Sequence, residues 1–300
     1  MTQINKRISL ALRGDSMRLV HSMHTLRAAT GRAIIFLRTL IFKTCFVLNT
    51  ALHMLLCLPV LAMPRGMFWM VVHSWIRFNH WLLRAICGID FQIDGAERIP
   101  PGPLLVASKH QSAWEAYALV PLFRDPTFVL KRELMWLPIG GWYLLKGQMI
   151  PVRRGAGSPA LAAMVERAKI QAKLGRQIVI FPEGTRRPPD ADPAYKNGIS
   201  RLYENLRLPC VPVALNSGLY WPRRSWFFQR GTIRVRILDP IPPGLDRASF
   251  LRCLQDKIEQ ATARLVHDGR LGARAGRYRR RRTDVTMKLR ALDIPRDTPE

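Results

Sequence analysis

Seven short runs of mainly apolar residues, spaced along residues 90–240, constrain the fold more than any other feature of this sequence. They lie at residues 91–93, 104–107, 127–130, 149–152, 177–181, 211–215 and 233–238. Several runs are continuous rather than alternating, which is typical of strands buried on both faces of a sheet. Segments 158–174, 198–206 and 247–266 have helical periodicity. The sequence therefore predicts an α/β fold in which a mixed, largely parallel sheet is covered by helices.

The amino-terminal third predicts a membrane-associated helical hairpin ahead of this sheet. Residues 1–43 carry eight Lys and Arg residues against the single acid Asp15, and residues 44–63 then carry no charge. An apolar stretch of about 20 residues is long enough to span a bilayer core, although polar residues interrupt this one. Residues 67–86 mix tryptophans with basic residues, as segments at a membrane interface do. A buried helical hairpin of a soluble domain is the alternative.

These segments divide the chain into a basic arm at 1–43, a hairpin at 44–88, an α/β domain at 89–266 and a basic tail at 267–300. Basic segments flanking apolar helices stay in the cytoplasm. We therefore expect the α/β domain on the cytoplasmic face of a membrane, whether the hairpin crosses the bilayer or enters one leaflet. The long basic segment before the apolar run is unlike a secretory signal. The tail, predicted to be flexible, is either solvated or binds anionic lipid or an acidic carrier protein.

Charge and cysteine usage narrow the classes of partner. A net charge of +26 combined with 48% hydrophobic residues excludes an ordinary disordered chain and predicts an anionic partner. Because the basic residues concentrate at the two ends and no known RNA- or DNA-binding pattern occurs, no nucleic acid is expected. Five scattered cysteines without a CxxC pair indicate reduced thiols. No histidine or cysteine group has the spacing of metal ligands, so no metal is expected.

The segment KHQSAWE at residues 109–115 places His110 just after the apolar run at 104–107. The carboxyl end of a strand is where ligands bind in open α/β folds. Glu115 follows at a distance from which it could orient the histidine ring. Ser112-x-x-Glu115 is also a capping box, in which Glu115 only accepts a hydrogen bond from a backbone N–H at a helix start. This segment alone leaves both interpretations open.

A second segment, FPEGTR at residues 181–186, follows the apolar run at 177–181. Gly184 lets the backbone approach a ligand closely, and the planar guanidinium of Arg186 suits phosphate. Such a turn is ordinary by itself. Its place at the end of a strand, in a sheet that already carries His110 at another strand end, favours a phosphate site.

Four ordered blocks, KHQSAWE at 109–115, IPVRR at 150–154, FPEGTR at 181–186 and VPVALNSG at 211–218, resemble the glycerolipid acyltransferase family, most closely the 1-acyl-sn-glycerol-3-phosphate acyltransferases. The resemblance covers roughly residues 90–245. It implies transfer of a fatty acyl group from acyl-CoA or acyl-ACP (acyl carrier protein) to the free hydroxyl of lysophosphatidic acid, giving phosphatidic acid at a membrane of anionic lipids, without a cofactor. Glycerol 3-phosphate, another lysophospholipid or a lyso-aminolipid are alternative acceptors, and a catalytically lapsed membrane scaffold is an alternative function.

The resemblance also implies roles for individual residues. His110 matches the catalytic histidine, and Glu115 stands where an aspartate is more usual. The residues implied in substrate binding are Lys131, Arg154, Glu183, Gly184, Thr185 and Arg186, and the neighbouring Arg153 leaves the register of Arg154 open. We expect His110 to act as general base and Glu115 to orient its ring. Because the sequence has no GxSxG motif, direct transfer without a covalent intermediate is expected, with backbone amides of the FPEGTR segment or of the helix start at Ser112 binding the oxyanion.

Overall fold

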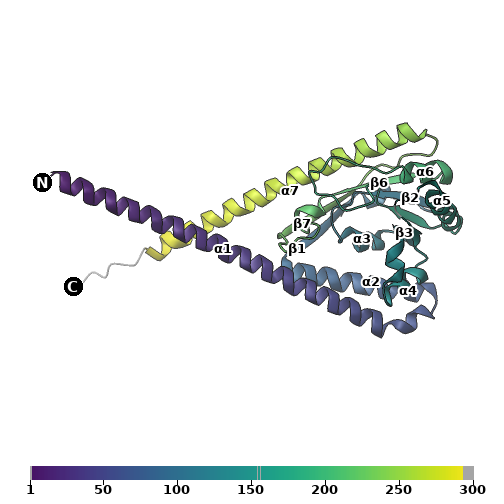
Figure 1. Cartoon of the computed structure of the whole chain (residues 1–300), viewed down its shortest axis with the longest axis horizontal. Helices are drawn as coiled ribbons and strands as arrows, with labels where there is room; N and C mark the ends of the chain where they lie inside the picture. Colours follow the sequence, from purple (N-terminus) through teal and green to yellow (C-terminus); the bar gives the residue numbers. More distant parts are fainter. Residues whose placement is uncertain (1, 154, 156, 293–300) are drawn as a thin grey trace.

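The computed structural model describes the backbone of residues 2–153, 155 and 157–292, and side chains over 29–153, 155 and 157–273. A central sheet lies between two layers of helices (Figure 1). The helices of one layer are α1 (Thr2–Leu56), α2 (Arg65–Leu82), α3 (Glu115–Ala118) and α4 (Gly140–Lys146). The other layer consists of α5 (Gly157–Lys173), α6 (Gly198–Leu206) and α7 (Arg247–Leu292). The two layers enclose separate apolar cores.

The sheet contains all seven predicted strands, in the order β1-β7-β6-β2-β5-β3-β4. Their bounds are β1 (Ile89–Asp94), β2 (Leu104–Ser108), β3 (Pro126–Lys131), β4 (Ile150–Val152), β5 (Gln177–Ile180), β6 (Cys210–Leu215) and β7 (Gly231–Ile237). Every neighbouring pair is parallel except β6–β7, which is antiparallel. The prediction of a mixed, largely parallel sheet is therefore confirmed.

Strand β2 shows why its apolar run is continuous. Successive side chains of a strand point to opposite faces. Leu104 and Val106 pack into the core shared with α1 and α2, whereas Leu105 and Ala107 pack into the core shared with α5, α6 and α7. All four are fully buried. A strand covered on both faces needs apolar residues at every position, and this strand delivers residues 109–115 to the carboxyl edge of the sheet.

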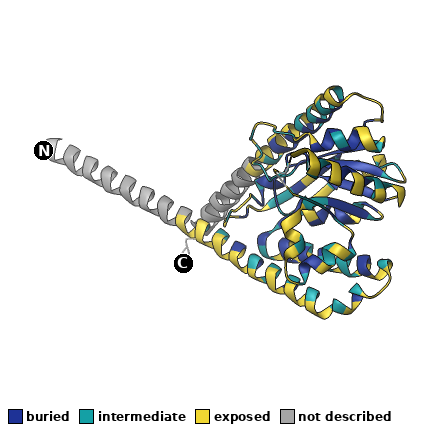
Figure 2. Ribbon diagram, turned by 45° about the vertical axis from the view of Figure 1, so that its right-hand side comes forward, coloured by how far each residue is buried: buried dark blue, intermediate teal, exposed yellow. Residues whose placement is uncertain are grey.

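The helical hairpin is formed by α1 and α2, which η1 (Leu58–Leu61) connects. Its first helix is longer than predicted, because α1 is continuous through the expected boundary between residues 43 and 44. The segment Ala29–Leu56 of α1 is apolar and long enough to cross a membrane, judged by length and composition. Much of this segment is exposed (Figure 2), including Leu37, Val47, Leu48, Leu52, Leu55 and Leu56.

Helix α7 also differs from the sequence prediction. It continues to Leu292, whereas we expected a flexible tail from residue 267. Alanine, arginine and leucine are frequent after residue 266, and all three have high helix propensity. No proline lies between residue 266 and Pro295. Local propensity therefore extends the helix beyond the part that packs on the sheet.

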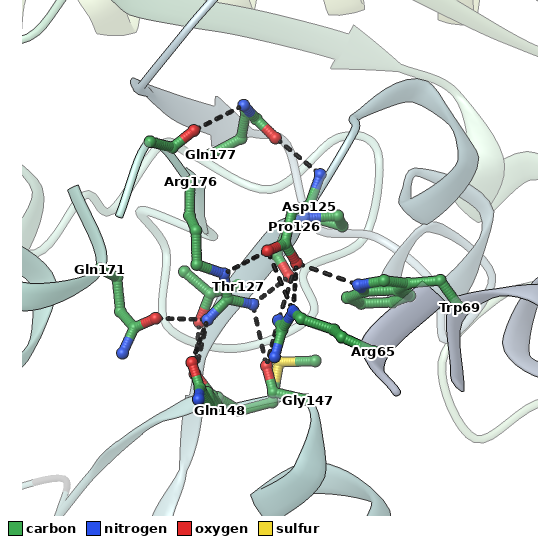
Figure 3. Close-up of polar contacts among 12 residues, drawn as sticks. Arg65, Trp69, Asp125, Pro126, Thr127, Gly147, Gln148, Gln171, Arg176 and Gln177 are labelled. Carbon is green, nitrogen blue, oxygen red and sulfur yellow. Dashed lines mark hydrogen bonds and ion pairs between the residues drawn. The ribbon is translucent and has the colours of Figure 1, made fainter. Parts of the chain in front are cut away.

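An ion-pair network centred on Asp125 joins the hairpin to the α/β domain (Figure 3). Arg65, the first residue of α2, donates to both carboxylate oxygens of Asp125, and the indole Nε1 of Trp69 donates to Oδ1 at 3.0 Å. Arg176, which precedes β5, lies 3.2 Å from Oδ2 and donates to the Gly147 carbonyl. Burial alone would raise the pKa of Asp125, but the hydrogen bond from Arg65 and the charges of both arginines hold it below its usual range. One carboxylate thus fixes α2 against the sheet.

Candidate active site

The strand order brings the chemically important segments to one edge. Strands β6, β2, β5 and β3 are parallel neighbours, so their carboxyl ends lie side by side. The segments that follow β6, β2 and β5 carry Ser217, His110 and residues 181–186, and Lys131 is the last residue of β3. The sequence predicts that these segments lie at strand ends, and the strand order determines which are adjacent.

His110 and Glu115 form a hydrogen-bonded pair at this edge. Nδ1 of His110 lies 3.0 Å from Oε1 of Glu115. The glutamate side chain is completely buried, whereas 14% of the histidine side chain is exposed. The extra methylene of glutamate, compared with aspartate, therefore does not prevent contact with the ring. Because Nδ1 is engaged by the carboxylate, Nε2 is the ring nitrogen left for a substrate.

The same carboxylate also stabilises the backbone at the start of α3. Its Oε1 accepts the N–H groups of Gln111 and Ser112, each at 2.6 Å, and its Oε2 accepts the hydroxyl of Ser217 at 2.8 Å. The hydroxyl of Ser112 accepts the Trp114 N–H rather than that of Glu115, so the capping box is incomplete. The capping and catalytic interpretations of Glu115 are therefore compatible, since one carboxylate makes both sets of contacts.

A buried ion pair between Lys109 and Glu183 holds the backbone of His110 in place. Nζ of Lys109 lies 2.9 Å from Oε1 of Glu183 and 2.8 Å from Oε1 of Glu259 on α7. Oε2 of Glu183 accepts the backbone N–H of His110 at 3.0 Å, and the hydroxyl of Tyr195 donates to Glu259. The side chains of Lys109 and Glu183 are fully buried. The resemblance predicts that Glu183 binds substrate. Its carboxylate instead contacts Lys109 and the backbone N–H of His110, and it thereby positions the histidine.

The rest of the FPEGTR segment forms a tight turn beside His110. Gly184 has φ of +65°, a conformation that favours glycine, and its N–H donates to the Phe181 carbonyl. The ring of Phe181 stacks on that of His110 with centroids 4.0 Å apart. Arg187 N–H donates to the His110 carbonyl, which joins the two loops. Burial, followed by the charge of a neighbouring arginine, lowers the pKa of Arg186.

An apolar pocket of about 450 Å³ opens beside the histidine. The sheet side contributes His110, Tyr117, Phe128 and Phe181, and the hairpin contributes Thr50, His53, Met54, Phe68, Trp69, Val72 and Trp75. Lys131, at the end of β3, lines the same pocket with a side chain that is 47% exposed and lies 3.7 Å from Glu133. This arrangement places a basic nitrogen and a cation at the boundary of a cavity that suits an alkyl chain.

The second sequence block lies elsewhere. Arg153 lines a separate cavity of about 790 Å³ together with Arg132 and Arg167. Arg154, the residue that we expected to bind substrate, lies outside the described residues. Within the described part of the chain, no group of three His, Cys, Asp or Glu side chains could hold a metal ion, and the five cysteines are free.

Known proteins resemble this chain both in sequence and in fold. An acyltransferase family model matches residues 90–216. The chain is 39% identical over 173 residues to a 1-acyl-sn-glycerol-3-phosphate acyltransferase of Pseudomonas aeruginosa, spanning 58% of this chain and 67% of that protein. It is 27% identical over 204 residues to a lyso-ornithine lipid O-acyltransferase of the same organism, spanning 62% and 78%. The structure of the 1-acyl-sn-glycerophosphate acyltransferase of Thermotoga maritima shares the fold, with a TM-score of 0.63, 19% identity, and coverage of 79% and 97%.

Proposed function

Because the chain belongs to the acyltransferase family that includes the 1-acyl-sn-glycerol-3-phosphate acyltransferases, we propose that it transfers a fatty acyl group from an acyl thioester to the free hydroxyl of lysophosphatidic acid. The product is phosphatidic acid. The observation that carries this proposal is the His110–Glu115 pair at 3.0 Å, at the edge of an apolar pocket. Acyl transfer needs a base for the hydroxyl and an apolar space for the chain, and the two meet at this edge.

In the proposed reaction, Nε2 of His110 takes the hydroxyl proton while the oxygen attacks the thioester carbonyl. The tetrahedral intermediate then expels the thiolate, which receives the proton from the imidazolium. Glu115 holds Nδ1–H and stabilises the positive charge of the ring, as the acid of a Ser-His-Asp triad does. Atoms and charge balance without a covalent acyl-enzyme. The thiol is carried by coenzyme A or by an acyl carrier protein.

The developing oxyanion needs N–H donors that are not already engaged. At the start of α3, the N–H groups of Gln111 and Ser112 donate to Glu115. In the FPEGTR segment, Gly184 N–H donates to Phe181. Among the described residues, the N–H groups of Thr185 and Arg186 have no such acceptor, and neither do those of Ala113 and Glu115 at the start of α3. These free amides are the candidate donors to the oxyanion.

We propose that the protein lies at the cytoplasmic face of a membrane, and the exposed apolar surface of the hairpin supports the membrane location. Apolar side chains are also exposed on η5 (Arg132–Trp136), on α4 and between them, namely Trp136, Leu137, Trp142 and Leu145. Helices α1 and α4 lie on the same side of the sheet (Figure 1). A lipid acceptor and its acyl chain can then enter the pocket from the bilayer, while the basic segments face anionic lipid.

The experiment incubates purified protein in lipid vesicles with an acyl thioester and a panel of acceptors: lysophosphatidate, glycerol 3-phosphate, lysophosphatidylcholine and a lyso-ornithine lipid. Products are identified by mass spectrometry. We expect phosphatidic acid from the wild type and none from His110→Ala. A product from the lyso-ornithine lipid alone would assign the protein to the acceptor of its 27% identical relative instead. Full activity of His110→Ala would reject the mechanism.

A further inference from the structure

Residues 222–228, between η6 (Ser217–Leu219) and β7, connect α1 to the active site; we call them the arginine–aromatic loop. On one side the loop is attached to α1. Nζ of Lys43 donates to the Ser225 carbonyl at 2.8 Å and lies 3.8 Å from the centroid of the Trp226 ring. The Phe36 ring contacts those of Trp226 and Phe227, with centroids 6.0 and 6.1 Å apart. The loop thus lies along the helix that we assign to the membrane.

On its other side, the loop reaches the FPEGTR segment. Nη1 of Arg223 donates to the backbone carbonyl of Arg186 at 3.1 Å. The next residue, Arg224, has φ of +57°, a left-handed conformation that non-glycine residues adopt rarely and that often marks functional loops. The electrostatics agree with this placement. Burial, then the charges of Arg223 and Arg224, lower the pKa of Arg186, while Glu115 opposes them.

These three arginines lie near one another, since the charges of Arg223 and Arg224 act on Arg186. Other arginines, such as Arg65, Arg176, Arg247 and Arg270, lie within ion-pair distance of a carboxylate. Within the part of the chain whose side chains are described, Arg186, Arg223 and Arg224 have no carboxylate at that distance. Guanidinium groups gathered in this way repel one another unless an anion lies between them. Their planar forks of donors match the oxygens of a phosphate group.

We propose that Arg223 and Arg224 complete, together with Arg186, a site for the phosphomonoester head of the acceptor lipid. The proposal rests on the proposed function for the identity of that lipid. The loop would both bind the phosphate group and hold it at the membrane interface. Arg223 contacts the segment beside His110 and the charge of Arg224 acts on Arg186. Trp226 and Phe227, which are 47% and 36% exposed, are aromatic residues of the kind that suits the membrane interface. A head group bound there stays at the interface while its hydroxyl reaches the base.

Two measurements on the full-length protein in detergent micelles test the proposal. The first determines kcat and KM for lysophosphatidate in the wild type, Arg223→Gln and Arg224→Gln. The second measures binding of lysophosphatidate, lysophosphatidylcholine and inorganic phosphate by calorimetry, without an acyl donor. Arg252→Gln is the matched control, because this exposed arginine on α7 donates to Ser249 and acts on Asp246, and neither residue belongs to the site.

We expect Arg223→Gln to raise the KM and the Kd for lysophosphatidate about 10-fold or more, the loss that accompanies removal of a charge-assisted hydrogen bond. Lysophosphatidylcholine binding and the Arg252→Gln control should stay unchanged. Unchanged KM and Kd in both loop variants would overturn the proposal while leaving acyl transfer intact. Inorganic phosphate that binds as tightly as lysophosphatidate would assign the site to free phosphate and likewise overturn it. If the wild type binds lysophosphatidate but does not acylate it, and Arg223→Gln weakens that binding, the site is supported and the proposed reaction is rejected.

Discussion

Replacement of Glu115 by glutamine tests whether its carboxylate acts on His110 or only on the backbone. Glutamine has the same length as glutamate. Its carbonyl oxygen can accept the N–H groups of Gln111 and Ser112, and its amide can donate to Ser217, so all contacts of the carboxylate have a neutral counterpart. The change therefore removes the negative charge while keeping the shape of the site.

The size of the effect follows from the distance between the two groups. When His110 takes the substrate proton, positive charge develops on a ring whose Nδ1 lies 3.0 Å from Glu115 Oε1. Two unit charges at that distance attract by about 5 kcal/mol at an effective dielectric constant of about 20. Because the dipole of the glutamine carbonyl retains part of this attraction, we expect the transition state to lose about 3 kcal/mol, or roughly 100-fold in kcat.

The assay measures initial rates of lysophosphatidate acylation, with kcat and KM determined separately, alongside thermal unfolding of each variant. Ser112→Ala is the control, since it removes the acceptor of the Trp114 N–H and leaves the His110–Glu115 pair in place. It should cost about 1 kcal/mol of stability and change kcat by no more than about twofold. A kcat of Glu115→Gln within about threefold of wild type would show that Glu115 only caps the helix and would refute the reasoning.

Three further predictions concern the partly buried network around Asp125 and the buried network around Lys109. Asp125→Asn should cost about 2 kcal/mol, because buried Arg176 loses its carboxylate whereas Arg65 stays partly exposed to solvent. This cost corresponds to a fall in Tm of roughly 4–8 °C. Glu204→Gln in an exposed pair should lower the Tm by no more than about 2 °C, and equal falls would contradict the prediction. Because the pKa of Asp125 is lowered in the folded state, its contribution is present above about pH 4 and is lost as the pH falls, so wild-type and Asp125→Asn Tm values should converge in acid. Glu259→Gln should lower kcat about 10-fold with little change in KM. The reason is that buried Lys109 then keeps only one carboxylate partner and shifts relative to the neighbouring His110. Tyr195→Phe preserves the charge of Glu259 and should retain activity, so identical losses in these two variants would rule out a charge effect.

The sequence was sufficient to predict features that depend on short-range order. All seven strands were predicted from apolar runs. The runs are continuous in β2, β5 and β6, which are buried at every position, because a strand covered on both faces is apolar throughout. The five-residue spacing of His110 and Glu115 left a helix cap equally open, and the resemblance of the four sequence blocks to the acyltransferase family predicted the pair. The order of the segments at the sheet edge, in contrast, depends on strand pairing, which no local pattern encodes.

The supporting contacts were missed for the same reason. Ser217 reaches Glu115 across 102 residues, and Glu259 reaches Lys109 across 150. Both contacts depend on how β6 and α7 pack beside β2, and a lone serine or glutamate at such a separation has no distinguishing spacing. Arg223 was likewise an ordinary basic residue in a loop until the fold placed it beside the FPEGTR segment. The signal that could have found it is the pairing of two arginines with two aromatic residues, Trp226 and Phe227, within a few positions.

The apolar pocket has walls from two parts of the chain, the sheet and the hairpin. Its hairpin wall includes Thr50, His53 and Met54 from α1 and Trp69 and Trp75 from α2. The first helix is consequently a structural part of the catalytic chamber as well as a candidate membrane anchor. Exchanging it for an unrelated transmembrane helix would keep the protein at the bilayer but leave the chamber open along one side, so these helices are not interchangeable modules in the design of chimeric acyltransferases.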